Sequence, residues 1–207
     1  MIAATMVCAV ACAALVGAEY RPLATLRVTA KLVASLAFLA VGLLAMDGGP
    51  YARWIVGGLA LGVIGDVALL GHGKRPFVVG LGAFQLGHRA YIVAIADLVP
   101  PRAWPGDAGV LAAAPIVVGV GALALLWPRL GNLRVPVIAY VLAIVTMMIG
   151  ALAARTNTRL VVGAALFFAS DLAVARERFV GRTFANKAWG LPAYYAAQLL
   201  IAWSIRG

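Results

Sequence analysis

Long apolar runs, each close to the length that crosses a bilayer, divide almost the whole chain. A transmembrane helix needs about 20 mostly apolar residues to cross a hydrocarbon core about 30 Å thick. The chain has 207 residues, of which 64% are hydrophobic and only 12% are charged, so it cannot hide its apolar side chains inside a water-soluble domain. The runs are Ile2 to Ala18, Val28 to Met46, Trp54 to Leu70, Phe77 to Leu98, Ala108 to Trp127, Val135 to Ala154, Leu160 to Ala175 and Trp189 to Ile205.

The connections between these runs are short and carry turn signals, such as Asp47-Gly-Gly-Pro50 and Pro100-Pro101. They leave no residues for a soluble domain. The sequence therefore predicts an all-α, polytopic membrane protein, a single domain of eight transmembrane helices over residues 1–207. The first run has no basic residue before Arg21, so we expect it to stay as a helix and not to be removed as a signal peptide.

The basic residues fall mainly on one side of this bundle. The net charge is +10, but it is spread over short loops, so we expect anionic membrane lipids and no nucleic acid as partners. The loops after odd-numbered helices hold 11 Lys and Arg residues against five on the other side, with Arg89 inside a span. The positive-inside rule then puts both termini outside the cytoplasm, in the cell (inner) membrane. The 11 are Arg21, Arg27, Lys31, Lys74, Arg75, Arg129, Arg134, Arg176, Arg178, Arg182 and Lys187.

Two aspartates interrupt the third and seventh runs. Asp66 and Asp171 both lie towards the ends of helices that run inwards, so we expect both carboxyl groups at one depth, near the cytoplasmic leaflet. An ionisable side chain inside a span costs several kcal/mol unless it faces the protein interior or a wet cavity, so it marks a functional site. The structural alternative is that each aspartate only caps or hydrogen-bonds a neighbouring helix.

Further polar side chains in the spans are candidates for binding a substrate. The alternatives are a simple contact between helices for the histidine and the interfacial aromatic belt for the tyrosines. The sequence carries no signal for an oligomeric state. The candidates are Gln85, His88, Tyr91, Tyr140, Tyr194, Tyr195 and Gln198.

We expect neither a metal nor a cofactor. The chain has two histidines, His72 and His88, so a three-histidine zinc site is excluded. Cys8 and Cys12 lie four apart on the first helix, and we assign them to packing. The sequence has no Gly-rich phosphate loop, serine elbow or His-Glu-x-x-His motif.

The two halves of the chain share a pattern. In each, an inward helix carries an aspartate, a basic loop follows, and the next helix carries a tyrosine 25 residues (Asp66 to Tyr91) or 24 residues (Asp171 to Tyr195) further on. This spacing predicts a four-plus-four internal repeat, as membrane proteins often have.

Five short motifs follow one another along the chain. They are Gly65-Asp66-Val-Ala-Leu-Leu70, Phe84-x-x-x-His88-x-x-Tyr91, Pro136-Val-Ile-Ala-Tyr140, Gly163-x-x-x-Phe167-Phe-x-Ser170-Asp171 and Tyr194-Tyr195-x-x-Gln198. In order and spacing they resemble the lysoplasmalogenase-like (YhhN-like) membrane proteins. Tyr20-Arg-Pro22 is similar to that family's basic-Pro step, with arginine in place of lysine. The resemblance runs over nearly the whole chain.

The resemblance implies a hydrolase that cleaves the vinyl ether bond of lysoplasmalogen, a lysophospholipid, into a fatty aldehyde and a glycerophospho-head group. It also implies two central aspartates, which map onto Asp66 and Asp171 as catalytic residues. The chemistry suits them, because glycosidases use two carboxyl groups on a related oxocarbenium ion. Either aspartate could be the acid. Phe167 and Phe168 favour Asp171, whereas the glycines beside Asp66 are expected to leave room for water.

Two other functions fit the same residues. A proton-coupled transporter of a small molecule or lipid would use the aspartates as a proton relay and the repeat for alternating access. Broken helices would favour transport, and the helices that carry the aspartates contain no proline. The other alternative is a non-catalytic lipid-binding or scaffold protein.

Overall fold

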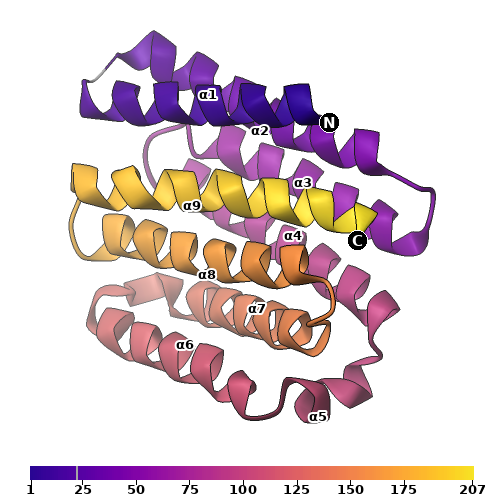
Figure 1. The fold of residues 1–207 in the computed structure, drawn as a ribbon. Helices are drawn as coiled ribbons and strands as arrows, with labels where there is room; N and C mark the ends of the chain where they lie inside the picture. The colour runs from indigo at the N-terminus through magenta and orange to yellow at the C-terminus, as the bar shows by residue number, and fades with distance from the viewer. Residues whose placement is uncertain (22) are drawn as a thin grey trace.

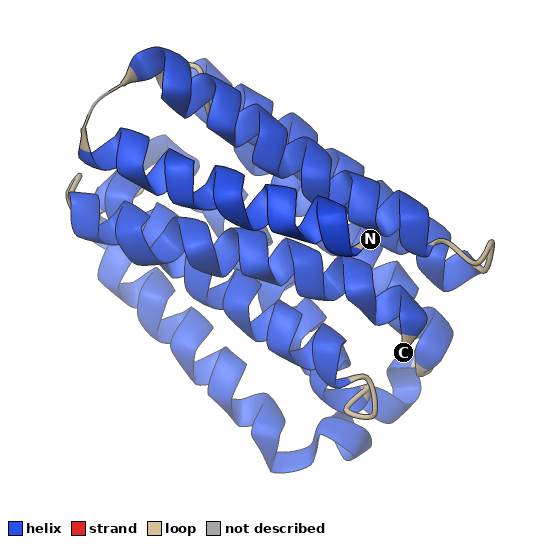
Figure 2. Ribbon diagram, turned by 45° about the horizontal axis from the view of Figure 1, so that its top comes forward, coloured by secondary structure: helices blue, strands red, loops and turns tan. Residues whose placement is uncertain are grey.

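The computed structural model describes residues 1–21 and 23–207, and Pro22 of the Tyr20-Arg-Pro22 step lies outside this described part. Within it, eight long helices lie side by side, and the short helix α5 connects two of them (Figures 1 and 2). The helices are α1 (Ile2–Tyr20), α2 (Ala24–Ala45), α3 (Pro50–Ala68), α4 (Lys74–Leu98), α5 (Trp104–Ala108), α6 (Ala113–Leu126), α7 (Arg134–Ala153), α8 (Thr158–Phe179) and α9 (Phe184–Trp203).

The eight predicted helices are confirmed, although several of their ends differ. α8 continues past Ala175 to Phe179, and α9 begins at Phe184 and not at Trp189. Hydropathy marks only the part of a helix in the hydrocarbon core, whereas both extensions carry charged residues that a helix accommodates near water. The stretch before α6 forms α5 and a short 3₁₀ turn, Gly109–Ala112, where a continuous helix from Ala108 was expected.

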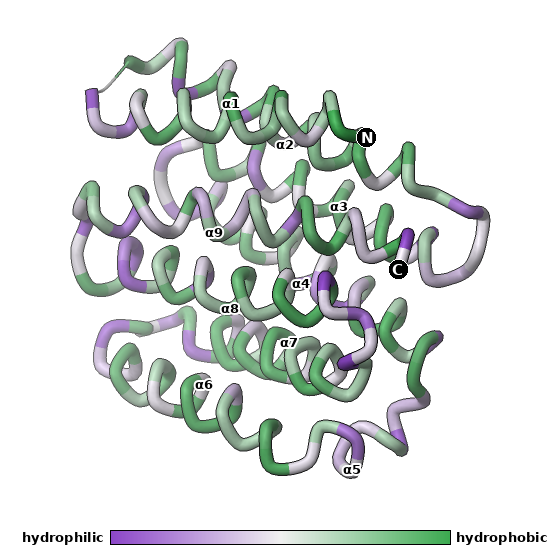
Figure 3. Tube along the Cα trace, in the orientation of Figure 1, coloured by the Kyte–Doolittle hydropathy of each residue, from purple (hydrophilic) through white to green (hydrophobic). Residues whose placement is uncertain are grey.

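The bundle is apolar enough to span a membrane several times. Among the described residues, seven helical segments have the length and composition of membrane spans: α1 to α4, Pro101–Arg129 with α6, Gly131–Ala153 with α7, and α8. α9 is not among these segments, and it packs against α8, α2 and α1. Apolar residues fill the middles of the helices, and hydrophilic ones gather near their ends (Figure 3). The prediction of a multi-pass membrane protein is confirmed.

Four connections lie together at the left end of the bundle in Figure 1, and both termini lie at the right end. The connections α1–α2, α3–α4, α6–α7 and α8–α9 define what we call the basic end. Lys31 was counted with the first of these loops although it falls in the run Val28 to Met46, and the structure places it inside α2, about two turns from its start. The four-plus-four repeat stays a prediction.

Close packing of α3 depends on three glycines. A Cβ atom at Gly58 would lie 2.2 Å from the Tyr91 ring, and one at Gly62 would lie 2.5 Å from the Gln198 amide nitrogen. At Gly65 it would lie 2.7 Å from the Phe84 ring. Small residues let membrane helices approach closely, and here the space that they leave is occupied by large side chains of α4 and α9.

A methyl group on this face should destabilise the bundle. We expect Gly58→Ala to cost about 1–3 kcal/mol, the usual cost of overpacking a core. Gly57→Ala is the matched control, because no atom lies within 4 Å of a Cβ built there. Thermal unfolding of the purified protein in detergent measures both variants, and equal midpoints would contradict the close contact.

Candidate functional site

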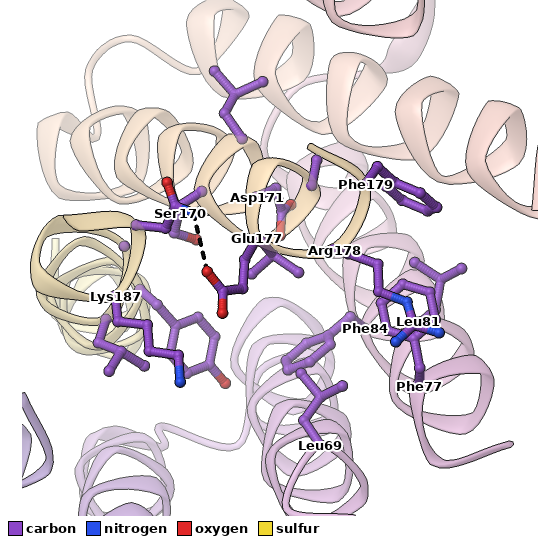
Figure 4. Close-up of a pocket in the computed structure, with 18 of the residues that line it drawn as sticks. Leu69, Phe77, Leu81, Phe84, Ser170, Asp171, Glu177, Arg178, Phe179 and Lys187 are labelled. Atoms are coloured by element: carbon purple, nitrogen blue, oxygen red, sulfur yellow. Dashed lines mark hydrogen bonds between the residues drawn. The ribbon is translucent and has the colours of Figure 1, made fainter. Parts of the chain in front are cut away.

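A cavity of about 590 Å³ opens at the basic end and extends between the helices (Figure 4). Its volume lies within the range of about 300–1,000 Å³ that is typical of ligand sites. Asp66 and Asp171 both line it. Its charged and polar lining, which we call the polar part, includes Glu19, Arg27, Lys31, His72, Glu177, Arg178, Arg182, Asn186 and Lys187. Its apolar lining, which we call the apolar part, includes Leu81, Gly119, Ala122, Leu126, Val137, Val141, Ile144, Leu172 and Ala175.

Asp171 joins α8 to α7 and α4. The Tyr140 hydroxyl on α7 donates a hydrogen bond of 3.0 Å to Asp171 Oδ1. Asp171 Oδ2 lies 3.5 Å from Nε2 of His88 on α4, and neither of these atoms has another partner among the described residues. The His88 side chain is fully buried, whereas that of Asp171 is 18% exposed, towards the cavity.

The hydrogen bond on the far side of His88 fixes where its protons can be. His88 Nδ1 lies 2.7 Å from the Phe84 carbonyl oxygen. A carbonyl can only accept, so Nδ1 must carry a hydrogen and donate it. Nε2 then faces a carboxyl oxygen, and two lone pairs would repel unless a proton lies on one of the two atoms. The geometry therefore favours one proton held between His88 and Asp171.

Asp66 has different surroundings. Lys31 Nζ lies 2.8 Å from Oδ1, so that an ammonium group pairs directly with the carboxylate. The hydroxyls of Ser35 and Tyr194 donate to Oδ2 at 2.7 Å and 2.8 Å. Asp66 is only 2% exposed. One cation and two hydroxyl donors thus surround this carboxyl group.

A chain of hydrogen bonds extends from Asp66 across the bundle. The Gln198 amide donates to the Tyr194 hydroxyl at 3.1 Å, and the Tyr91 hydroxyl donates to the Gln198 carbonyl oxygen at 2.7 Å. Behind Asp66, the hydroxyls of Tyr195 and Ser35 lie 3.4 Å apart. Buried polar groups of α2, α3, α4 and α9 thus satisfy one another, as low-dielectric surroundings require.

Aromatic rings lie between the surroundings of the two aspartates. The Phe167 ring centroid is 4.6 Å from that of His88 and 5.5 Å from that of Tyr194. The Phe84 ring is 5.7 Å from that of Tyr194. The two carboxyl groups therefore share one cavity but have separate partners.

The predicted binding residues occupy two layers. Tyr140 and Tyr194 line the cavity, together with the two aspartates. Gln85 is half-buried on α4, is not part of the cavity lining, and makes no side-chain hydrogen bond within the described residues. Arg89 is exposed on the outer face of α4. The layer behind the lining holds His88, Tyr91, Tyr195 and Gln198.

Sequence reasoning missed Lys31 and Ser35, and it misjudged the glycines. Lys31 and Ser35 lie four apart on α2, a spacing that puts both on one helix face and could have indicated a partner for an intramembrane aspartate. The expectation of room for water beside Asp66 was wrong. Gln198 and Phe84 fill the spaces at Gly62 and Gly65.

A model of the YhhN family matches residues 26–205 of the chain. This chain belongs to the YhhN family. It is 36% identical over 170 residues, 79% of its length, to a lysoplasmalogenase of Mycobacterium tuberculosis, and the match spans only 64% of that protein. It is 33% identical over 168 residues to lysoplasmalogenase TMEM86B of Sus scrofa, covering 81% of this chain and 70% of the relative. No solved structure matches the chain significantly.

The YhhN family match confirms the resemblance found in the sequence. The matched region begins in α2 and ends after α9, so it includes Lys31, both aspartates and every residue that lines the cavity except Glu19. The relatives cover similar shares of the chain, including TMEM86A of Bos taurus, a lysoplasmalogenase that is 30% identical over 165 residues, 75% of this chain and 66% of the relative.

Removing the Lys31 ammonium should destabilise this YhhN protein strongly. Lys31→Met leaves the Asp66 carboxylate buried without a cation, which typically costs about 3–5 kcal/mol. The double variant Lys31→Met/Asp66→Asn should recover most of this loss. Lys187→Met is the control, because its pair with Glu19 is more exposed and should contribute no more than about 1 kcal/mol. Similar unfolding midpoints for Lys31→Met and Lys187→Met would contradict the ion pair.

Proposed function

We propose that this YhhN protein is a membrane hydrolase that cleaves the vinyl ether bond of lysoplasmalogen. The products would be a fatty aldehyde and a glycerophospho-head group, such as glycerophosphoethanolamine or glycerophosphocholine. The observation that carries the proposal is the contact between Asp171 and His88, which supplies a proton beside an amphiphilic cavity. The names of the mycobacterial, pig and cattle relatives support the choice of substrate.

The polarity of the cavity suits a single-chain phospholipid. Basic side chains outnumber acidic ones in the polar part, where a phosphate would bind. Figure 4 shows Glu177 and Lys187 on this side, opposite Phe84 and Leu69. Along α8, Asp171 lies six residues before Glu177, about 9 Å deeper at 1.5 Å per residue. This offset leaves room for the glycerol unit between a bound phosphate and the reacting bond.

The first proposed step is protonation of the alkene. The proton held between Asp171 Oδ2 and His88 Nε2 passes to the vinyl carbon that is not bonded to oxygen, and the carbon–carbon π electrons form the new C–H bond. The remaining carbon–oxygen unit becomes an oxocarbenium ion. The pair left behind, an Asp171 carboxylate and neutral His88, carries the negative charge that stabilises this cation. The Tyr140 hydrogen bond holds the carboxylate in place.

The second proposed step restores the proton. Water adds to the carbon that bears the oxygen, and the proton that it loses returns to Asp171 and His88. The resulting hemiacetal collapses when its bond to the glycerol oxygen breaks. That oxygen keeps the electron pair and takes up the hydroxyl proton. One carboxyl group thus acts as acid and then as base, as in glycosidases that retain configuration.

We assign Asp66 the role of a fixed charge. Lys31, Ser35 and Tyr194 occupy both of its oxygens, so it is not placed to give a proton to a substrate, but its charge could stabilise a nearby cation. Through Tyr194, which lines the cavity and donates to its carboxylate, Asp66 also fixes the wall that faces the substrate.

Asparagine at either aspartate should abolish most of the activity. We expect Asp171→Asn to lower turnover by about 10²–10⁴-fold, the usual contribution of a general acid, and Asp66→Asn also to lower it severely. The double variant should be little worse than the poorer single one, because residues that act as a unit are not additive. Aldehyde release from a lysoplasmalogen in detergent measures all three, with Asp97→Asn, an exposed carboxyl group on α4, as the matched control. Near-normal turnover in Asp171→Asn would remove this residue from the chemistry.

We further propose that the basic end faces the cytoplasm of a cell (inner) membrane, so that the cavity opens at the cytoplasmic leaflet. The bias of Lys and Arg towards this end supports the orientation. A reporter that fluoresces only in the cytoplasm should therefore stay dark when it is fused to the C-terminus. The same reporter inserted between Gly71 and Gly73, in the α3–α4 connection, should be bright. The opposite pattern would invert the topology.

A further inference from the structure

One wall of the cavity has no part in the proposed chemistry. It is formed by α6, on which Pro115, Gly119 and Leu126 are buried and Ala122 is half-buried, at intervals of three or four residues. The last three line the cavity. The opposite face is exposed, with Val117 at 68% and Leu125 at 73%. α6 therefore separates the apolar part of the cavity from the outside of the bundle.

Glycine at position 119 sets how close this wall lies. A Cβ atom there would be 2.7 Å from Val145 Cγ2 and 3.2 Å from Val141 Cγ1, both on α7. At the basic end, Leu126 clusters with Leu130 and Val137, against which Phe179 of α8 also packs. α6 is thus held against α7 along its inner face.

The wall is continuous with the reacting groups. Tyr140, which donates to Asp171, precedes Val141 in α7, and Val141 both lines the cavity and faces Gly119 across the α6–α7 contact. α7 thus carries both a partner of Asp171 and a residue that contacts the α6 wall. Leu172 and Ile144 also line the cavity.

We propose that the apolar part of the cavity binds the single hydrocarbon chain of the substrate and that Ala122 on α6 determines how long a chain it accepts. This inference rests on the proposed function, which places the reacting bond at Asp171 and the phosphate in the polar part. The chain must then continue from Asp171 in the apolar direction, and it meets α6 where Ala122 leaves space. A fatty chain matches such a region because moving its methylene groups out of water and against apolar side chains is favourable.

Bulk at Ala122 should shift the chain-length preference. For Ala122→Phe, we expect the ratio of kcat/KM for an 18-carbon over an 8-carbon alkenyl substrate to fall at least tenfold, within the range that a hydrophobic pocket can discriminate. Ala122→Leu, which adds less volume and is easier to accommodate, should give a smaller fall in the same direction. Ala124→Phe is the matched control, since it makes the same change on the exposed face of α6 and should leave the ratio unchanged.

Binding separates this inference from the proposed reaction. Ester-linked lysophosphatidylcholines of 8 to 18 carbons have no vinyl ether, so their affinity for the detergent-solubilised protein reports the chain site alone. If Ala122→Phe weakens long-chain binding at least tenfold while no lysoplasmalogen is cleaved, the chain site, meaning the apolar part of the cavity bounded by Ala122, is supported and the proposed function fails. If cleavage proceeds but Ala122→Phe and Ala122→Leu both keep the chain-length profile of the folded parent protein, the chain site is wrong.

Discussion

The ion pair between Lys31 and Asp66 is the interaction on which the polar interior depends. Neither charge could be buried alone at this depth, because an unpaired ionised group in hydrocarbon is costly. Together with Ser35 and Tyr194 the pair links α2, α3 and α9, and the hydrogen bonds continue through Gln198 to α4. The glycines of α3 make this possible, because they let the amide and rings of α4 and α9 come close. The polar network therefore depends on the small residues of α3, which leave space for its side chains.

The two aspartates show how surroundings divide the roles of identical side chains. Asp66 has a cation and two hydroxyl donors, whereas Asp171 has one hydroxyl donor and a histidine nitrogen that bears no other contact. Under the proposed chemistry, the first arrangement serves as the fixed charge and the second as the source of the proton. Such a difference between neighbouring carboxyl groups is the general way in which a site obtains both an acid and a fixed anion.

Much of this arrangement was accessible from the sequence. The eight runs and the position of Asp66 and Asp171 towards the basic end follow from hydropathy, and Tyr140 and Tyr194 were candidates beside the alternative of an interfacial aromatic belt. Lys31 was missed because a charge count by loops cannot tell a lysine in a loop from one a few residues inside a helix. The sequence also could not predict which side chains fill the space beside Gly62 and Gly65, since a glycine indicates only that another group can come close. Gln85 was a predicted binding residue but does not line the cavity, because a polar residue in a span can lie on a helix face that points away from the site.

The division of the cavity into a charged and an apolar part also bears on how the reaction would end. Under the proposed chemistry, the bond that breaks lies beside Asp171, between the two parts, so each product is left in surroundings that match it. The head group, with its phosphate, would find itself among arginines and lysines open to water, and the aldehyde would lie against α6, next to the bilayer. The two products would then not need to pass each other. The head group would leave into the aqueous phase and the aldehyde into the lipid, and their separate exits would make recombination improbable.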